Sequence, residues 1–428
     1  MLPKLQGNRP VSSTKSGVYL HFPYCLQKCH YCDFYSVGLD ELADSDFDAR
    51  LKSYEMALSS EIQARASDAL FSGQTYDSIF FGGGTSSLMP PSMILRILEL
   101  LRSNFRIEDD CEITLEGNPE NLRPDYLNAL ADIGINRVNS GLQTYNAAFL
   151  KDMNRFFDTR QYDSLLSSLT ESKIHSVGVD LIYGFAGQTF QEFETDLRAV
   201  LAWPIQHLSV YSLTVEPDTR YARHIRKGSQ SAPNASLQER IFENLPIILA
   251  DHGFLQYEVS NYAKDGQICR HNWKYWDYRP YLGLGPGAHG FNGKYRYANP
   301  RNLQAWSSRP DGAATDSELH DPVIDLLLNQ FRIALPISLQ RIREVWEEQN
   351  WENSLLQRRW NALLQTLRQF EREGLGELHS SALKGLASPY SATASASHIE
   401  KSEFLWHASG MALLDSNIER LVLSIADN

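Results

Sequence analysis

Short apolar runs alternate with longer amphipathic segments through the first half of the chain. Six runs have the length of buried strands, and they cover Gly17–Pro23, Ser78–Gly82, Glu112–Leu115, Asn136–Leu142, Ser176–Tyr183 and Leu208–Leu213. Between them, segments such as Phe47–Leu70 and Ser92–Phe105 carry apolar residues at intervals of three and four, which indicates helices. This alternation predicts a parallel sheet with right-handed helical crossovers.

The number of strand and helix units limits the architecture. A complete barrel of this kind has about eight units, so six predict an α/β fold built on a partial (β/α)6 TIM-like barrel that is open on one side. We expect a flexible leader over residues 1–16, the barrel over 17–250, a covering segment rich in aromatics and glycines over 251–310, and a smaller, mainly helical domain over 311–428. In that last domain, Asp321–Leu335 and Ser338–Phe370 read as amphipathic helices and Ser380–Ser397 as an exposed loop.

Composition narrows the functional classes. With 428 residues, of which 43% are hydrophobic, the chain can bury a large core and a second domain. A net charge of -12 argues against general affinity for nucleic acid. No apolar run approaches the roughly 20 residues that span a membrane, and the leader lacks the apolar region of a secretion signal. We therefore expect a cytoplasmic protein without stable membrane insertion.

Three cysteines directly after the first predicted strand carry the most specific chemistry. Cys25, Cys29 and Cys32 form a CxxxCxxC pattern. A 4Fe-4S cluster normally takes four thiolates, so three leave one iron open to another ligand. The amino and carboxylate groups of S-adenosylmethionine can chelate such an iron.

Other interpretations of the cysteines rank lower. A zinc site would need a second cysteine or histidine pair further along the chain, and none follows. Five cysteines without a secretory leader disfavour disulfides most strongly. Cys111 lies in an apolar run and reads as a buried thiol, while Cys269 stays open as a pocket residue.

The cysteine pattern, with aromatic residues inside it and an apolar strand before it, resembles the radical S-adenosylmethionine superfamily. Within it the chain is similar to the oxygen-independent coproporphyrinogen III oxidase group, from about Val18 through Gly283–Gly290 and more weakly to the C-terminus. The oxidases of this group carry a further cysteine two positions after the third, and a long N-terminal arm. Here Asp33 and Phe34 follow Cys32, and only a short leader precedes Val18, which favours the haem chaperone branch.

A second motif supports that branch. The segment His271-Asn272-Trp273-Lys274-Tyr275-Trp276 matches the HNxxYW pattern of the haem chaperones. Histidine is a common ligand to haem iron, and the flanking aromatics Tyr275 and Trp276 could stack on the macrocycle. From these residues alone, an aromatic turn whose histidine binds a backbone group is the simpler interpretation. Together with the resemblance of the cysteine loop, the haem-binding interpretation becomes the preferred one.

The resemblance also implies which residues bind S-adenosylmethionine at the strand ends. Tyr19 and Tyr31 would pack against the cofactor, and Arg155 would contact its carboxylate. The remaining expected contacts are Gly83, Gly84, Thr85, Glu116, Gln143, Asp180 and His289. Taken singly, each could instead be an ordinary strand-end cap or turn residue, and the glycine run lacks the spacing of a phosphate-binding loop.

Two functions follow from the resemblance. The first is a haem chaperone that holds the cluster and S-adenosylmethionine, binds haem as cargo and delivers it to haem-accepting apoproteins. The second is an active coproporphyrinogen III oxidase of porphyrin biosynthesis, in which an electron from a low-potential donor enters the cluster and S-adenosylmethionine yields a 5'-deoxyadenosyl radical. The sequence leaves open whether the protein is an enzyme; if active, it would be a coproporphyrinogen dehydrogenase-type oxidoreductase.

Overall fold

A computed structural model shows the architecture of this chain. It describes residues 15–42, 46–155, 158, 161–309, 316–317, 321–349, 351–379, 403–407, 410–411 and 414–426. The expected leader, apart from its last two residues, and the loop predicted at Ser380–Ser397 lie outside the described residues.

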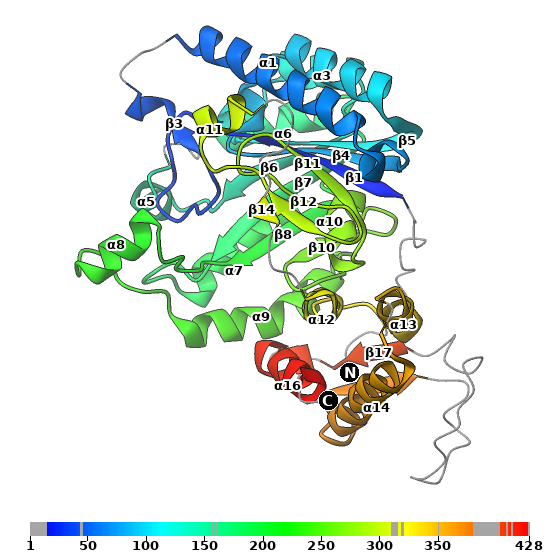
Figure 1. Cartoon of the computed structure of the whole chain (residues 1–428). Coiled ribbons are helices and arrows are strands. Elements are labelled where there is room, and N and C mark those ends of the chain that lie inside the picture. The colour runs from blue at the N-terminus through cyan, green and yellow to red at the C-terminus, as the bar shows by residue number, and fades with distance from the viewer. Residues whose placement is uncertain are drawn as a thin grey trace.

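The six predicted strands lie side by side in one sheet. They are β1 (Ser16–Phe22), β4 (Thr75–Gly83), β5 (Arg106–Gly117), β6 (Arg137–Gln143), β7 (Ser176–Tyr183) and β8 (His207–Ser212). Each is parallel to its neighbours in the order β1-β4-β5-β6-β7-β8, which confirms the predicted α/β class (Figure 1). Since these strands are parallel and adjacent, their carboxyl ends meet at one edge.

The segment predicted to cover the barrel forms short strands that lengthen the sheet at both edges. Strand β11 (Tyr281–Leu284) is parallel to β1, and β12 (His289–Phe291), β13 (Arg296–Ala298) and β14 (Asp316–Ser317) follow it in antiparallel order. At the other edge β10 (Asn261–Ala263) and β9 (Leu255–Gln256) continue from β8. Within the described residues the strand order is linear from β14 to β9, so the barrel is open.

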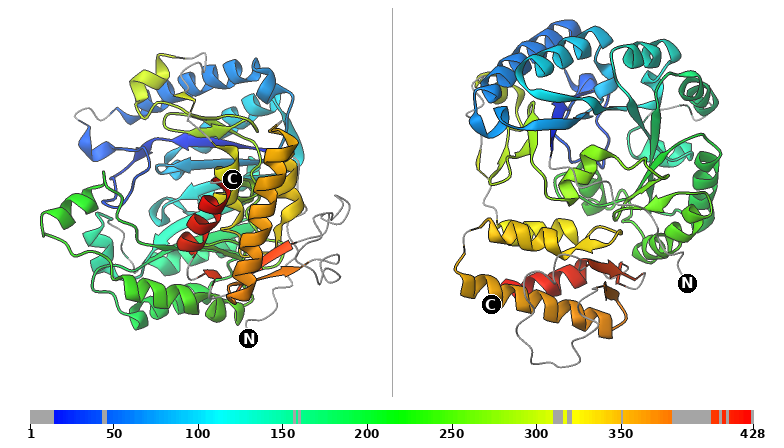
Figure 2. Two further views of the ribbon diagram at one scale, coloured as in Figure 1. Left: turned by 60° about the horizontal axis from the view of Figure 1, so that its bottom comes forward. Right: turned by 90° about the vertical axis from the view of Figure 1, so that its right-hand side faces the viewer.

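Helices cover the outer face of the curved sheet (Figure 2). Along the chain from β1 to β9, the described helices are α1 (Phe47–Ala66), α2 (Ala69–Ser72), α3 (Pro91–Asn104), α4 (Pro124–Asp132), α5 (Ala147–Asp152), α6 (Tyr162–Glu171), α7 (Phe190–Leu201), α8 (Arg220–Arg226) and α9 (Ala235–Ala250). Of these, α5 and α8 lie at the edge where the strands end, not on the outer face (Figure 1). The helix predicted over Phe47–Leu70 is divided, because the Asp68 side chain accepts a hydrogen bond from Leu70 N and begins α2.

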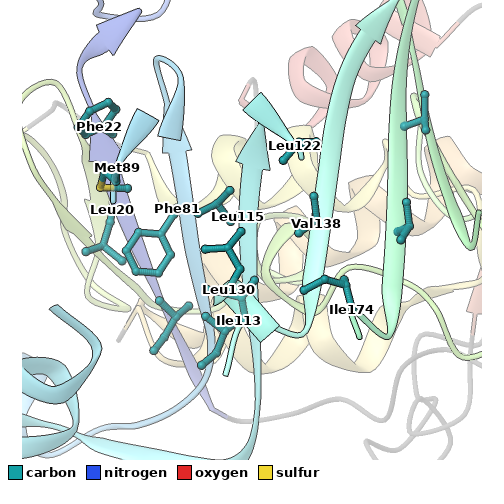
Figure 3. Close-up of a cluster of buried hydrophobic side chains, with 14 of the residues drawn as sticks. Leu20, Phe22, Phe81, Met89, Ile113, Leu115, Leu122, Leu130, Val138 and Ile174 are labelled. Carbon is teal, nitrogen blue, oxygen red and sulfur yellow. The ribbon is translucent and has the colours of Figure 1, made fainter. Parts of the chain in front are cut away.

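Alternation along the strands separates an apolar outer face from a polar inner one. On β1, Val18, Leu20 and Phe22 join the main hydrophobic core, whereas Tyr19 and His21 face the barrel interior. Figure 3 shows the outer face, where side chains from neighbouring strands pack together. The labelled members are Leu20, Phe22, Phe81, Met89, Ile113, Leu115, Leu122, Leu130, Val138 and Ile174. The inner face is therefore free for polar chemistry.

The C-terminal part has its own elements and shares a core with the segment before it. Its helices are α12 (Pro322–Gln330), α13 (Leu339–Glu347), α14 (Asn353–Arg372) and α16 (Leu414–Ala426). Among the described residues, β15 (Ile337–Ser338), β17 (Glu403–Trp406) and β16 (Gly376–His379) add a small sheet that the sequence did not predict. Trp273, of α10 (Arg270–Trp276), packs into this core. No helix within the described ranges is both long and apolar enough to cross a membrane.

Two substitutions on α1 test how the outer face stabilises the fold. Leu58 is fully buried in the main core, whereas Met56, two residues earlier on the same helix, is 72% exposed. We expect Leu58→Ala to lower the free energy of unfolding by about 2–5 kcal/mol, since it removes buried methyl groups and leaves a cavity. Met56→Ala should change it by less than about 0.5 kcal/mol. Urea unfolding measures both, and equal losses would contradict the assigned packing.

Candidate functional site

The three cysteines lie on a loop that begins where β1 ends. Cys25 closes the short strand β2 (Tyr24–Cys25), which pairs with β3 (Val37–Gly38) on the far side of the loop. His30, between the second and third cysteines, is held on both sides of its peptide, because its N–H donates to Met153 O at 3.0 Å and its carbonyl accepts from Tyr221 N at 2.8 Å. The loop is thus held by the residue after α5 and by the first turn of α8 (Arg220–Arg226).

The thiols lie close enough together to influence one another's ionisation. Burial, and then the charges of Cys29 and Cys25, raise the pKa of Cys32 to about 12. Within the described residues no three Cys, His, Asp or Glu side chains converge as ligands of one metal ion. A four-iron cluster does not require such convergence, since each thiolate binds a different iron. Its positive irons would also offset the mutual repulsion of three thiolates.

The glycine-rich turn after β4 packs directly against the start of the cysteine loop. Gly84 N donates to Phe22 O at 2.6 Å, and Thr85 N donates to Tyr24 O at 2.8 Å. A Cβ atom on Gly84 would lie 2.6 Å from Tyr24 O, and one on Gly83 would lie 2.7 Å from the His21 ring. These close backbone contacts therefore hold the start of the cysteine loop against the turn. The Thr85 hydroxyl also hydrogen-bonds the Cys25 thiol.

A hydrogen-bonded chain leads from this turn to the predicted arginine. Asn118 Nδ2 donates to Thr85 Oγ1 at 3.4 Å, and Arg155 Nη2 donates to Asn118 Oδ1 at 2.9 Å. Arg155 also donates to the Gly141 carbonyl. The sequence did not single out Asn118, although it follows Glu116 by two residues at the same strand end. The structure thus connects a cysteine of the loop to Arg155 through two polar side chains.

Two acidic side chains face the barrel interior near the same edge. A Cβ atom on Gly82 would lie 3.0 Å from Glu116 Oε2, so Glu116 reaches across to β4. Burial, and then the charge of Asp180, raises the pKa of Glu116 to about 8. Burial raises the pKa of Asp180 to about 6, although a hydrogen bond from Ser209 opposes the shift. A ligand that donates hydrogen bonds, such as a ribose diol, would satisfy both carboxylates.

The remaining residues expected at the strand ends lie around the same edge. Gln143 ends β6 with a positive φ of 72°, and its side chain lies over Gly141 beside Arg155. Tyr31 packs against a small apolar cluster that includes Met153 and is partly buried. His289 begins β12 and is exposed. These side chains and the cysteine loop therefore lie around the edge formed by the carboxyl ends of the strands, which is called the rim below.

The HNxxYW motif, whose His271, Tyr275 and Trp276 are the expected haem contacts, lies away from these residues, in the interior of the fold. The motif forms most of α10, and His271 is fully buried against the first residues of β1 and β4. Its Nδ1 is 3.1 Å from Ser78 Oγ and its Nε2 is 2.9 Å from Tyr275 Oη. A Cβ atom on Gly17 would lie 2.8 Å from Nδ1. His271 thus has no free ring nitrogen to offer an iron atom in this arrangement.

The motif's other side chains connect strands β4 and β11 to the C-terminal core. Lys274 pairs with Asp77 at 2.5 Å, and both side chains are buried. Tyr275 packs edge-to-face on Tyr281 with ring centroids 4.8 Å apart, and Trp276 lies against the C-terminal core. Burial, together with the charge of Lys274, lowers the pKa of His271 to about 3, so the ring is neutral.

Comparisons with known proteins bear on this geometry. The model of the radical SAM superfamily matches residues 19–200. The heme chaperone HemW of Mycobacterium tuberculosis is 32% identical over 311 residues, which cover 72% of this chain and 78% of that protein. HemW of Buchnera aphidicola is 31% identical over 338 residues, covering 77% of this chain and 85% of the relative. The chain belongs to the radical S-adenosylmethionine superfamily.

Within this superfamily, the relatives above 30% identity that match most of the chain include these proteins named HemW. Membership implies a 4Fe-4S cluster and S-adenosylmethionine as cofactors. The structure of Escherichia coli coproporphyrinogen III oxidase, HemN, superposes with a TM-score of 0.74 and covers 98% of this chain and 92% of that one. At 21% identity this likeness shows the shared fold.

The raised pKa of Glu116 gives a testable pH dependence in protein without cofactors. Glutamate has an ordinary pKa of 4.5, and in the folded chain the pKa of Glu116 is about 8. Between these values the folded state binds more protons, so the free energy of unfolding falls as pH rises from about 4.5 to about 8. We expect Glu116→Gln to weaken this decline and to be more stable than wild type at pH 8.

Urea unfolding at a series of pH values measures this effect. Glu239→Gln, on the exposed side of α9, is the matched control and should follow the wild-type curve. Parallel curves for wild type and Glu116→Gln would contradict the assigned environment of Glu116.

Proposed function

We propose that this protein is a haem chaperone that carries a radical-type cluster. The observation that carries the proposal is the loop of three cysteines, which lies at the rim of an open barrel beside two buried carboxylates and an arginine. The proposal draws its haem component from the relatives named as heme chaperones, which match most of the chain.

Each part of the rim has a distinct task in this proposal. Cys25, Cys29 and Cys32 would hold the cluster. Arg155, already fixed by Asn118 and the Gly141 carbonyl, would face the carboxylate of S-adenosylmethionine. The other proposed contacts to this cofactor are Tyr19, Tyr31, Gly83, Gly84, Thr85, Glu116, Gln143, Asp180 and His289. When bound, the cluster and its cofactor supply one-electron chemistry, and the apolar packing of Tyr31 would exclude water from it.

Haem would enter through the open side of the barrel. The sheet ends at β14 and β9 within the described residues, so no strand pairing closes the interior to a flat macrocycle. We propose that α10 serves haem binding indirectly, because its aromatic residues pack against the inner face of the sheet and not at the rim. Tyr19 illustrates this support, since its ring stacks on His271 at a centroid distance of 6.2 Å.

An active oxidase is the second function to be tested. The chain has Asp33 and Phe34 where the oxidases have a further cysteine after the third, which supports the chaperone. Haem titration of anaerobic protein with a reconstituted cluster, and a separate assay for conversion of coproporphyrinogen III to protoporphyrinogen IX, distinguish the two. Turnover without haem binding would overturn our proposal.

The cysteine loop gives a direct prediction for cluster content. We expect Cys29→Ser to abolish the cluster, because serine lacks the thiolate that binds iron. Cys111→Ala is the matched control, since Cys111 is buried in the main hydrophobic core. Iron and sulfide analysis after anaerobic reconstitution measures both variants. Wild-type iron content in Cys29→Ser, or bound zinc in place of iron in the wild type, would contradict the cluster assignment.

The buried position of His271 gives a prediction for haem binding. We expect His271→Ala to keep the wild-type absorption spectrum of bound haem, because both ring nitrogens are occupied by Ser78 and Tyr275. The same variant should lower the melting temperature, since two buried hydrogen bonds lose their partner. Titration followed by ultraviolet-visible spectroscopy tests it, and a changed Soret band would reinstate His271 as the iron ligand.

A further inference from the structure

A buried glutamate outside the rim connects four elements behind the cysteine loop. Glu61 lies on the inner face of α1 and is 3% exposed. Its Oε2 accepts hydrogen bonds from Gly285 N at 2.8 Å and from Trp306 Nε1 at 2.9 Å. Its Oε1 accepts one from Asn299 Nδ2 at 2.6 Å. Gly285 follows β11, Asn299 follows β13, and Trp306 lies on α11 (Leu303–Ser307).

The described contacts of the Glu61 carboxylate are with donors. Arg65, one turn along α1, forms an ion pair with Oε1 at 3.9 Å. Burial raises the pKa of Glu61, and these donors oppose the rise. A side chain that presents a donor in place of either oxygen would therefore meet another donor at hydrogen-bond distance, which leaves both groups unsatisfied.

Glu61 and Asn299 together fix both polar groups of the Gly285 residue. Glu61 accepts from its N–H, and Asn299 Nδ2 donates to its carbonyl at 2.8 Å. Gly285 has a positive φ of 95°, and a Cβ atom there would lie 2.4 Å from the carbonyl oxygen of His21. The clamped residue is thus pressed against the backbone of β1, four residues before Cys25.

The other end of the cysteine loop touches the same clamped segment. A Cβ atom on Gly287 would lie 2.7 Å from Cβ of Tyr35, which stands three residues after Cys32. His21 Nε2 donates to the Tyr35 carbonyl at 2.7 Å. The segment from Gly285 to Gly287 therefore contacts the chain both before and after the three cysteines, and Glu61 fixes its first residue.

We propose that Glu61 is a positioning residue for the cysteine loop, and that through Gly285 it sets the geometry in which the cluster binds S-adenosylmethionine. This inference rests on the proposed cluster and cofactor. Glu61 itself lies behind the loop, so its effect reaches the cofactor only through the clamped backbone.

The test compares Glu61→Gln with two controls on the same helix. Glu55→Gln removes a surface carboxylate whose partner is Arg96 at 2.6 Å. Leu58→Ala destabilises the same buried helix face without touching Gly285. The readouts are iron content, melting temperature, and the electron paramagnetic resonance spectrum of the reduced cluster during titration with S-adenosylmethionine.

We expect Glu61→Gln to retain its iron, to bind S-adenosylmethionine about tenfold more weakly, and to give an altered spectrum of the complex. Glu55→Gln should match the wild type in every readout. Leu58→Ala should lower the melting temperature and leave the titration unchanged. If Glu61→Gln shifts only the melting temperature, as Leu58→Ala does, its role is purely structural and the proposal is overturned.

A second pair of variants tests the clamp even if Glu61→Gln does not fold. Each variant removes one donor from Glu61, but Asn299→Ala also removes the side-chain donor to the Gly285 carbonyl and leaves that oxygen only Ala288 N at 3.2 Å. Trp306→Phe leaves both hydrogen bonds of Gly285 in place. We expect weaker binding of S-adenosylmethionine in Asn299→Ala only. Equal binding in the two variants would overturn the proposal. A wild-type spectrum that does not respond to S-adenosylmethionine would instead refute the proposed function, which separates the two failures.

Discussion

The rim depends on the close approach of backbone to backbone on both sides of β1. On one side, a Cβ atom at Gly84 would lie 2.6 Å from Tyr24 O, and on the other, one at Gly285 would lie 2.4 Å from His21 O. Real Cβ atoms do not approach other atoms so closely, so only glycine allows the neighbouring strands to meet the end of β1 here. The cysteine loop thus leaves the sheet from a backbone that is confined on both edges.

This confinement explains how a polar loop can be held at a fixed place. The outer face of the sheet is apolar and packs under helices, which supplies most of the stabilisation. The inner face instead carries carboxylates, an arginine and hydroxyls, and burial raises the pKa of Glu116 and Asp180. Buried polar groups that lack full satisfaction cost stability, and such groups concentrate where ligands bind. The polar inner face therefore lowers the stability of the fold, and the apolar packing of the outer face compensates for this loss.

The sequence was sufficient to predict the sheet and much of the rim. Apolar runs located the six adjacent parallel strands, and the rule that their carboxyl ends meet placed Glu116, Gln143 and Asp180 together. It did not predict the bounds of β11, which has only four residues and lies among glycines and aromatics. It also missed α10, since a short aromatic segment gives too few turns for a helical period to be visible.

Glu61 shows why other site residues escaped prediction. Its spacing from Leu58 and Arg65 puts it on the buried face of α1, so a glutamate stands at a position where the pattern expects an apolar residue. That conflict was a visible signal, but the partners that resolve it, Asn299 and Trp306, lie more than 200 positions away in the sequence. Long-range polar contacts have no local period, and only the fold reveals them.

The position of α10 changes how its motif should be understood. Its buried ion pair with Asp77 ties it to β4, while Trp273 and Trp276 pack into the C-terminal core. His271 stacks on Phe80 and Tyr19, whose hydroxyl lies 3.1 Å from His21 Nδ1, and His21 in turn contacts the segment held by Glu61. The C-terminal core and the cysteine loop are therefore joined through packed rings along the inner wall. A motif in that place acts on the rim through the residues that it supports.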